Sequence, residues 1–340
     1  MSKSFCGKSC DKCINKKQGL CIGCSMCEIN FCNCSKDKKN RCFVRCPRKF
    51  GSNIIIQDLV KKNQNKNIMA NKKLELPLFI PVMPDRVRTI FDFSKTNGYI
   101  AVHGEFLLSA NGEDITPIYR KRGYKSALGL NEKNIKGIAE FYIKDRTLEG
   151  FWNNRKVIYE QLKKQNFTAV ITPNFSLYED APRQEHLYNI QRVKTIYNEM
   201  ISEGLPAVLD VVWAEEEDLN YWIKEIKNSG IKTVAFSFMS VGLKASNSWR
   251  HYALAYKILV SSLEPDVDII VAGLSSNKRI ATILELSKGR RISIMHQAAW
   301  VKSRKGFLES ENKQVDRSIS KDKIFQMNLE YYADSYKEFV

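Results

Sequence analysis

The sequence has no long apolar run. Of its 340 residues, 44% are hydrophobic and 27% are charged, and no stretch approaches the ~18 consecutive apolar residues that a membrane-spanning helix needs. Met1 to Cys6 contain none of the apolar core that a secretory signal requires. We therefore expect a cytoplasmic protein without a membrane partner. The composition also excludes a wholly disordered chain.

Cysteine is absent after Cys46, and histidine is absent before His103. All ten cysteines therefore lie in the first 46 residues. In a reducing compartment such a density favours metal ligation over disulfides. Because no histidine lies near them, mixed Cys/His zinc fingers are excluded and all-cysteine sites remain. The candidate metal ligands are Cys6, Cys10, Cys13, Cys21, Cys24, Cys27, Cys32, Cys34, Cys42 and Cys46.

The spacing of the cysteines is typical of a compact thiolate site. Two triads, C-x3-C-x2-C and C-x2-C-x2-C, begin at Cys6 and Cys21, and Cys46 is followed by proline. Thiolates one turn apart converge on one centre at little cost in loop-closure entropy. The second triad and the Cys-Pro pair together have ferredoxin-like spacing. We therefore favour an iron–sulfur cluster as the cofactor and keep zinc as the alternative.

The first triad carries two resemblances. Phe5 to Cys24 resemble a small Cys-rich domain of unknown function. The C-x3-C-x2-C spacing is also similar to that of radical S-adenosylmethionine enzymes, where three ligands leave one iron open for the cofactor. In those enzymes the triad follows the first barrel strand, whereas here it precedes every predicted strand. The position therefore argues against S-adenosylmethionine, and an atypical radical enzyme stays as a second alternative.

Negative charge is scarce in the first 75 residues. This segment holds 17 Lys and Arg against 5 Asp and Glu, a net of +12 out of the chain's +17. Basic residues beside a metal module suit the phosphate backbone of nucleic acid, so we expect tRNA or DNA as a partner. Solubility is the alternative explanation of the charge. The predicted domains are a Cys-rich metal-binding module at 1–50, a basic polar linker at 51–76, either a short helix or solvated chain, and an α/β domain at 77–340.

From residue 77 onward, apolar runs alternate with amphipathic helical segments, as in βα units around a parallel sheet. Eight such runs in roughly 260 residues favour a TIM-like α/β barrel, a (βα)8 fold. An open doubly wound sheet is the alternative. Residues 104–135 fit an insertion better than a helix. The predicted strands are 77–82, 98–102, 136–143, 167–172, 206–212, 232–238, 267–273 and 291–296, and the predicted helices are 152–165, 183–203, 215–229, 248–262, 276–287 and 321–337.

Polar residues follow several of the predicted strands, where a barrel places its catalytic groups. Asp210 ends an apolar run, and a carboxylate buried there needs a partner or a task. The glycine and serines that follow the seventh strand precede a helix whose N-terminus suits a phosphate, with a plain N-cap as the alternative. The candidate catalytic residues are Asp210, Asp180, His103 and His296, and the candidate substrate- or phosphate-binding residues are Asn174, Ser176, Tyr178, Trp213, Gly273, Ser275 and Ser276.

Two elements resemble an uncharacterised bacterial and phage family of unknown function. They are Trp-Asn-Asn at 152–154 and Thr-Pro-Asn-Phe-Ser-Leu-Tyr-Glu-Asp-Ala-Pro at 172–182, and Asn189 and Arg192 add to the match. In that family the position of Asn174 is usually Asp. The resemblance therefore implies that any catalysis by that carboxylate is lost or altered here.

A fainter resemblance, to the tRNA-guanine transglycosylase superfamily and its DNA-modifying branch, covers 77–81, 101–106 and 298–304. It implies base exchange by an Asp nucleophile and base recognition by a second Asp. The two positions fall on His296 and Val102, so both carboxylates are missing. A related barrel with different chemistry is what this resemblance implies.

Together these observations predict a metal-binding barrel protein that acts on or binds nucleic acid or a nucleotide, with base modification as the reaction to test. The missing carboxylates leave catalysis open. The alternative function is a non-catalytic nucleic-acid-binding or accessory protein of a mobile element.

Overall fold

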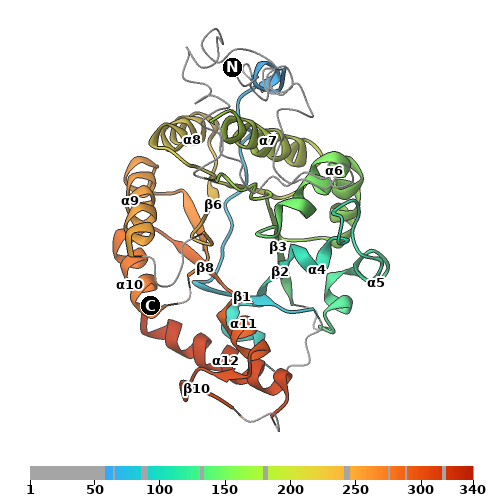
Figure 1. The fold of residues 1–340 in the computed structure, drawn as a ribbon, viewed down its shortest axis with the longest axis vertical. Coiled ribbons are helices and arrows are strands. Elements are labelled where there is room, and N and C mark those ends of the chain that lie inside the picture. The colour runs from blue at the N-terminus through green and yellow to red at the C-terminus, as the bar shows by residue number, and fades with distance from the viewer. Residues whose placement is uncertain are drawn as a thin grey trace, which may run out of the picture.

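Eight parallel strands form a closed barrel in chain order, and helices surround it (Figure 1). Closure confirms the TIM-like α/β barrel and excludes the open doubly wound sheet, in which the two outermost strands would not pair with each other. Each strand overlaps the range predicted for it. The strands are β1 Phe79–Met83, β2 Tyr99–His103, β3 Lys136–Glu140, β4 Ala169–Ile171, β5 Ala207–Asp210, β6 Thr233–Ser237, β7 Asp268–Ala272 and β8 Ile292–His296.

The computed structural model describes most of the chain from residue 58 onward. The described residues are 58–63, 66–85, 91–130, 134–178, 183–240, 246–274, 276–287, 289–315 and 319–339. The ten predicted metal ligands, together with Asp180 and Ser275, lie outside these ranges. Within the described ranges, no three His, Cys, Asp or Glu side chains are grouped so as to hold a metal ion. The same ranges contain no helix that is long and apolar enough to span a bilayer.

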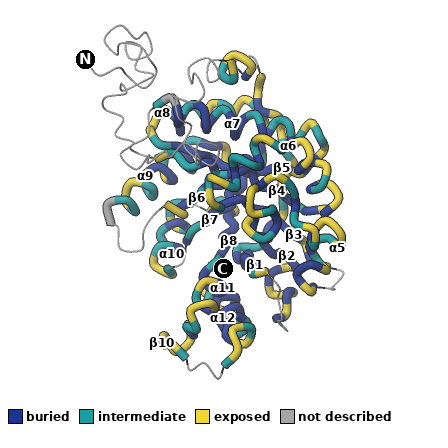
Figure 2. Tube along the Cα trace, turned by 45° about the vertical axis from the view of Figure 1, so that its right-hand side comes forward, coloured by how far each residue is buried: buried dark blue, intermediate teal, exposed yellow. Residues whose placement is uncertain are grey.

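The barrel strands are buried on both faces, which is why they appear in the sequence as uninterrupted apolar runs. Ile100, Val170 and Ile269 are 0% exposed. Figure 2 shows the buried residues along the strands and on the helix sides that face them. The predicted helices are present. They are α6 Asp145–Gln165, α7 Arg183–Ser202, α8 Glu216–Ser229, α9 Ser246–Ser262, α10 Asn277–Leu286 and α12 Lys321–Ser335.

Residues 104–135 differ from the expectation of an insertion without a helix. They contain α4 Gly104–Leu107 and α5 Pro117–Ala127, and α5 packs against α6 as the connection between β2 and β3. Gly123 interrupts α5 with a φ of 72° and a ψ of 161°, outside the helical range. This kink breaks the helical periodicity of the sequence, so the pattern concealed the helix.

The C-terminal part packs on the outside of the barrel near β8 and β1. The short helix α11 Ala298–Arg304 and α12 pack on each other, and α11 also contacts β1. A small hairpin, β9 Phe307–Leu308 with β10 Lys313–Gln314, lies between them in the chain. The 3-10 turn η4 Tyr336–Phe339 continues α12. This layer covers the outer face of β8, which determines the surroundings of His296.

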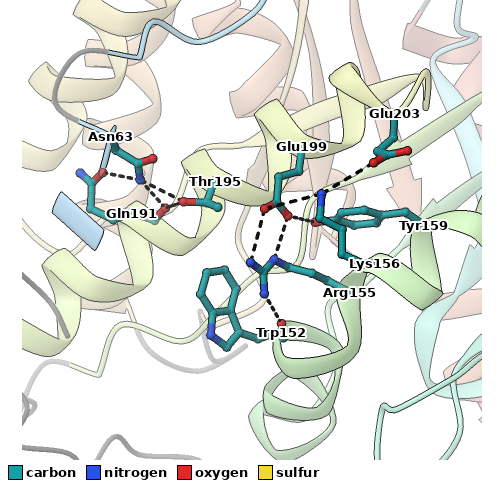
Figure 3. A network of polar contacts seen from close by, with 9 residues as sticks. All are labelled: Asn63, Trp152, Arg155, Lys156, Tyr159, Gln191, Thr195, Glu199 and Glu203. Carbon is teal, nitrogen blue, oxygen red and sulfur yellow. Dashed lines mark hydrogen bonds and ion pairs between the residues drawn. The ribbon is translucent and has the colours of Figure 1, made fainter. Parts of the chain in front are cut away.

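The described part of the segment predicted as a linker lies against the barrel domain. Asn63 donates hydrogen bonds from Nδ2 to Gln191 and to Thr195 Oγ1, both on α7 (Figure 3). Further along the chain, Tyr197 donates its hydroxyl proton to the carbonyl of Met69. Asn63 and Met69 therefore lie against α7.

Asn71 ends this segment at the N-terminal ends of β5 and β6. Its Nδ2 donates to the carbonyls of Ala207 and Thr233, at 3.3 and 2.7 Å. Its Oδ1 accepts from the backbone N–H groups of Lys232 and Thr233, at 2.8 and 3.2 Å. One amide side chain therefore bonds four backbone groups at the start of β5 and β6.

We expect Asn71→Ala to destabilise the domain, because it leaves these four backbone groups without their partner. The expected loss in the free energy of unfolding is about 2–4 kcal/mol, measured by urea denaturation. Asn67→Ala, an exposed asparagine of the same segment, is the matched control and should unfold at the wild-type midpoint. Equal midpoints for both variants would contradict this role of Asn71.

Candidate functional site at the barrel mouth

The register of the strands determines which polar residues face the barrel mouth. Residues paired across parallel strands point to the same face, and every second residue returns to it. His103 pairs with Glu140, and the registers of β3, β4 and β5 place Asp210 on that same face. The register of β6 adds Ser237. These four side chains therefore point to the inside of the barrel at the C-terminal ends of their strands.

A chain of hydrogen bonds crosses the mouth from β2 to β5. His103 Nδ1 is hydrogen-bonded to a carboxylate oxygen of Glu140, whose other oxygen accepts from the backbone N–H of Tyr142 at 2.8 Å. The Tyr142 hydroxyl donates to Asp210 Oδ1 at 3.1 Å, and Asn174 Nδ2 donates to Asp210 Oδ2 at 2.6 Å. Two predicted site residues, His103 and Asp210, are therefore linked through residues that the sequence analysis did not select.

His103 and Glu140 form a buried acid–base pair. Glu140 is 0% exposed and His103 is 6% exposed. Burial by itself lowers the pKa of His103, but the charge and the hydrogen bond of Glu140 outweigh it and raise that pKa above 6.5. Because Glu140 occupies Nδ1, the ring presents Nε2 toward the half-exposed Glu105, whose Oε2 lies 3.9 Å away. The imidazole therefore has one nitrogen fixed and one directed outward.

Asp210 is a carboxyl group that exchanges protons near neutral pH. It is 0% exposed. Burial raises its pKa from 3.8 to about 7; the hydrogen bonds from Asn174 and Tyr142 oppose this rise, and the charge of Glu140 adds to it. Such a shifted carboxyl at the mouth of a barrel has the physical properties of a catalytic acid or base.

The segment that follows β4 brings Asn174, Ser176 and Tyr178 to the mouth. Ser176 donates its backbone N–H to Asp145 Oδ1 at 2.9 Å, and the Tyr178 hydroxyl donates to Asp145 Oδ2 at 2.6 Å. Asp145 is the first residue of α6, so one carboxylate holds two of the three predicted contact residues. Asn174 contacts Asp210 and so presents an amide, not a second carboxylate, beside it.

A small cleft lies beside this network. Its volume is about 40 Å³, the space of two or three water molecules. Trp213 forms part of its wall and packs on Tyr252, with ring centroids 5.0 Å apart. The lining residues are Asn174, Phe175, Ser176, Leu177, Val211, Val212, Trp213, Ser237, Ser240 and Tyr252.

His296 does not lie at the barrel mouth, which corrects its prediction as a catalytic residue there. The register places Ser293 and Met295 of β8 on the inner face, so His296 points outward to the helices. Its ring centroid lies 4.1 Å from that of Tyr332 on α12. Burial, with a smaller effect of Lys302, lowers its pKa to about 3, and neither ring nitrogen has a hydrogen-bond partner in the described structure. The helix layer, not the mouth, surrounds this histidine.

The backbone geometry at Gly273 explains why a glycine stands there, without a role in binding phosphate. Its φ is +84°, and a Cβ atom there would lie 2.5 Å from the backbone nitrogen of Met239. The glycine therefore allows the segment after β6 to pass close to the end of β7. Ser276 occupies the N-cap position of α10, without a side-chain capping bond.

Glu140 and Tyr142 were not among the predicted site residues, although the sequence carries a signal for Glu140. Glu140 is a lone carboxylate in an apolar run, the same signal that identified Asp210. Because the third strand was predicted to extend to residue 143, Glu140 seemed to lie inside it; the strand ends at Glu140.

Fold and site together define an α/β-barrel protein with an acid–base network at the C-terminal ends of its strands. The chain belongs to the family described as Domain of unknown function (DUF4417), which matches residues 116–285. This match confirms the resemblance to an uncharacterised family. It contains Glu140, Asn174 and Asp210, whereas His103 lies before it.

Two curated relatives are similar to this chain, the Gene 1 proteins of Mycobacterium phages L5 and D29. Each is 26% identical over 110 residues, which are 32% of this chain and 45% and 38% of the relatives. The chain therefore matches less than half the length of these relatives. Among solved structures, the YdjI aldolase from Escherichia coli K12 matches with a TM-score of 0.44 and 10% identity, over 83% of this chain and 93% of that one.

We expect Glu140→Gln to lower the pKa of His103, because burial then acts without the opposing carboxylate charge. The midpoint can be measured by NMR titration of the histidine ring signals, with His103→Gln assigning the resonance. Glu105→Gln is the matched control: Glu105 also faces the ring but is half-exposed, so its removal should shift the midpoint much less. A midpoint that stays at the wild-type value in Glu140→Gln would contradict the pairing.

We expect His296→Phe to remove an acid sensitivity of folding. The folded pKa of about 3 lies below the unfolded value of 6.5, so the neutral ring stabilises the fold above pH 6.5. This stabilisation is lost as the pH falls from 6.5 toward 3. Between pH 7 and pH 5 the wild type should lose ~2 kcal/mol more unfolding free energy than the variant, as measured by urea denaturation. The same pH dependence in both proteins would show that the ring is not held neutral.

Proposed function

We propose that this protein is an enzyme that uses the mouth of its barrel for general acid–base catalysis on a nucleotide or a nucleic-acid base. The observation that supports it most is the pair of titrating groups, His103 on β2 and Asp210 on β5, joined across the barrel mouth by Glu140 and Tyr142 at the C-terminal end of β3. Catalytic groups of α/β barrels gather at this end, and a carboxyl pKa raised to about 7, as for Asp210, suits proton transfer.

The two groups have different parts in this proposal. Glu140 orients the His103 ring and stabilises its protonated form, so Nε2 is the atom that exchanges a proton with the substrate. Asp210 gains and loses its proton near pH 7 and is oriented by Tyr142 and Asn174. A proton released at one group can therefore be taken up at the other as the reaction proceeds.

The substrate class is inferred from the charge of the sequence. The net of +12 in the first 75 residues suits a polyanion whose backbone is held while the barrel mouth contacts a base. We propose that the ten cysteines supply the ligands of iron–sulfur clusters, or of zinc as the alternative, within this basic segment. The faint transglycosylase resemblance favours base modification as the reaction.

A second candidate function is a non-catalytic nucleic-acid-binding protein, such as an accessory protein of a mobile element. One observation favours it: Asp210 is fully buried and both of its oxygens already accept hydrogen bonds. In this case the network at the mouth would stabilise the fold, and binding would depend on the basic segment alone.

One experiment separates the two functions. The full chain is purified anaerobically, its iron, zinc and absorption at about 400 nm are recorded, and it is mixed with tRNA or DNA. Binding is measured as a function of salt, and digested nucleosides are analysed by mass spectrometry. We expect binding that weakens steeply with salt, and a base change whose rate falls about 10²–10⁴-fold in His103→Gln and in Asp210→Asn.

Asp268→Asn is the matched control, because Asp268 is a buried carboxylate at the opposite end of the barrel, 5% exposed. It should keep the wild-type rate. Binding without any base change would favour the accessory protein, and no binding at low salt would overturn both candidates.

A further inference from the structure

The segment that carries Asn174 is held by side chains from two helices. Residues 172–178 have no helical or strand structure, so their backbone groups need other partners. Asp145 accepts from the Ser176 N–H at 2.9 Å, and Asn189 Nδ2 donates to the Ser176 carbonyl at 2.8 Å. His186 Nε2 lies 2.7 Å from the carbonyl oxygen of Tyr178.

Arg192 lies buried beneath this segment. Its side chain is 2% exposed, and its guanidinium carbon is 3.8 Å from the ring centroid of Phe175. One terminal nitrogen donates to Glu149 Oε1 and the other to Asn189 Oδ1, each at 2.5 Å. The planar cation therefore stacks on a residue of the segment and bonds a second residue that holds it.

The bond from Arg192 determines how Asn189 acts. A side-chain amide has one accepting and one donating end, and a flip exchanges them. Because the guanidinium donates to Oδ1, Nδ2 must face the Ser176 carbonyl, where a donor is required. Without the guanidinium, the amide loses this constraint and Phe175 loses the surface on which it stacks.

Phe175 and Ser176 directly follow Asn174, which donates to Asp210 Oδ2. We propose that Arg192 is the positioning residue of the site: through Phe175 and Asn189 it holds Asn174 against Asp210. The inference rests on the proposed function for the role of Asp210, but its test measures protonation in the absence of substrate.

Removal of Arg192 is therefore expected to change the pKa of Asp210. The groups that face Asp210 are Asn174, Tyr142 and, through its charge, Glu140. The bond from Asn174 stabilises the carboxylate and lowers its pKa, while burial and Glu140 raise it. If Arg192 is removed, the bond from Asn174 weakens while burial and the charge of Glu140 remain. The pKa of Asp210 must then rise.

The test is an NMR titration of protein with ¹³C-labelled aspartate carboxyls, with Asp210→Asn assigning the signal. We expect Arg192→Met to raise the Asp210 midpoint by about one pH unit, the effect of losing one charge-assisted hydrogen bond. Asn174→Ala should raise it by a similar amount, and the double variant should shift no further than either one. Independent residues would instead give additive shifts.

Arg155→Met is the matched control. Its guanidinium carbon lies 4.2 Å from the ring centroid of Trp152, and it pairs with Glu199 on α7 (Figure 3). Arg192 contacts the same ring, 5.8 Å away. Arg155→Met therefore removes an arginine that is ion-paired between α6 and α7 but lies away from residues 172–178. This variant should leave the Asp210 midpoint unchanged.

An unchanged midpoint in Arg192→Met, or a shift that adds fully to that of Asn174→Ala, would overturn the proposal. If Arg192→Met does not fold, Asn189→Leu decides, because it deletes only the bonds to Ser176 and Arg192; the proposal requires the same upward shift. A protein that lacks turnover but shows these shifts would contradict the proposed function and leave the role of Arg192 supported.

Discussion

The hydrogen bonds to Asp210 are the constraint on which the barrel mouth depends. A carboxyl group that is fully buried must either stay protonated or receive donors for both oxygens. Here the donors come from two separate segments, Tyr142 after β3 and Asn174 after β4. Each donor must be held in place by its backbone. Glu140, which is bonded to His103, holds the backbone of Tyr142, and Phe175, which stacks on Arg192, follows Asn174 directly. The stability of the mouth and its chemistry therefore rest on the same contacts.

Much of the fold was predictable because parallel strands buried on both faces appear as plain apolar runs. The same property prevented prediction of the site. A strand without alternation does not indicate which residues face inward, so His103 and His296 looked equivalent at the ends of their strands. The closed register separates them, and register is a long-range property that the sequence of one strand does not carry. Glu140 was likewise not recognised as the last residue of its strand, because the apolar run led to a prediction of β3 that was three residues too long.

Local backbone exceptions account for another difference. Gly123 gives α5 a non-helical residue within an otherwise helical stretch. The hydrophobic periodicity therefore did not predict the helix, and the presence of a glycine does not by itself indicate such a kink. The polar segment before the barrel is a related case. Its Lys- and Asn-rich composition was compatible with a short helix or a solvated linker and did not indicate that Asn71 bonds four backbone groups of the barrel. Composition indicates how polar a segment is. Whether that segment packs against the barrel depends on hydrogen-bonding groups of the barrel that lie opposite its side chains.

Glu140 bridges the two halves of the mouth, because one of its oxygens is bonded to His103 and the other holds the Tyr142 backbone. Its charge also acts on both titrating neighbours. Ionisable groups linked in this way gain and lose protons in steps that belong to the set rather than to any single member. A midpoint observed for the mouth is thus a joint quantity, and a substitution at one end of the set alters the apparent acidity of the other.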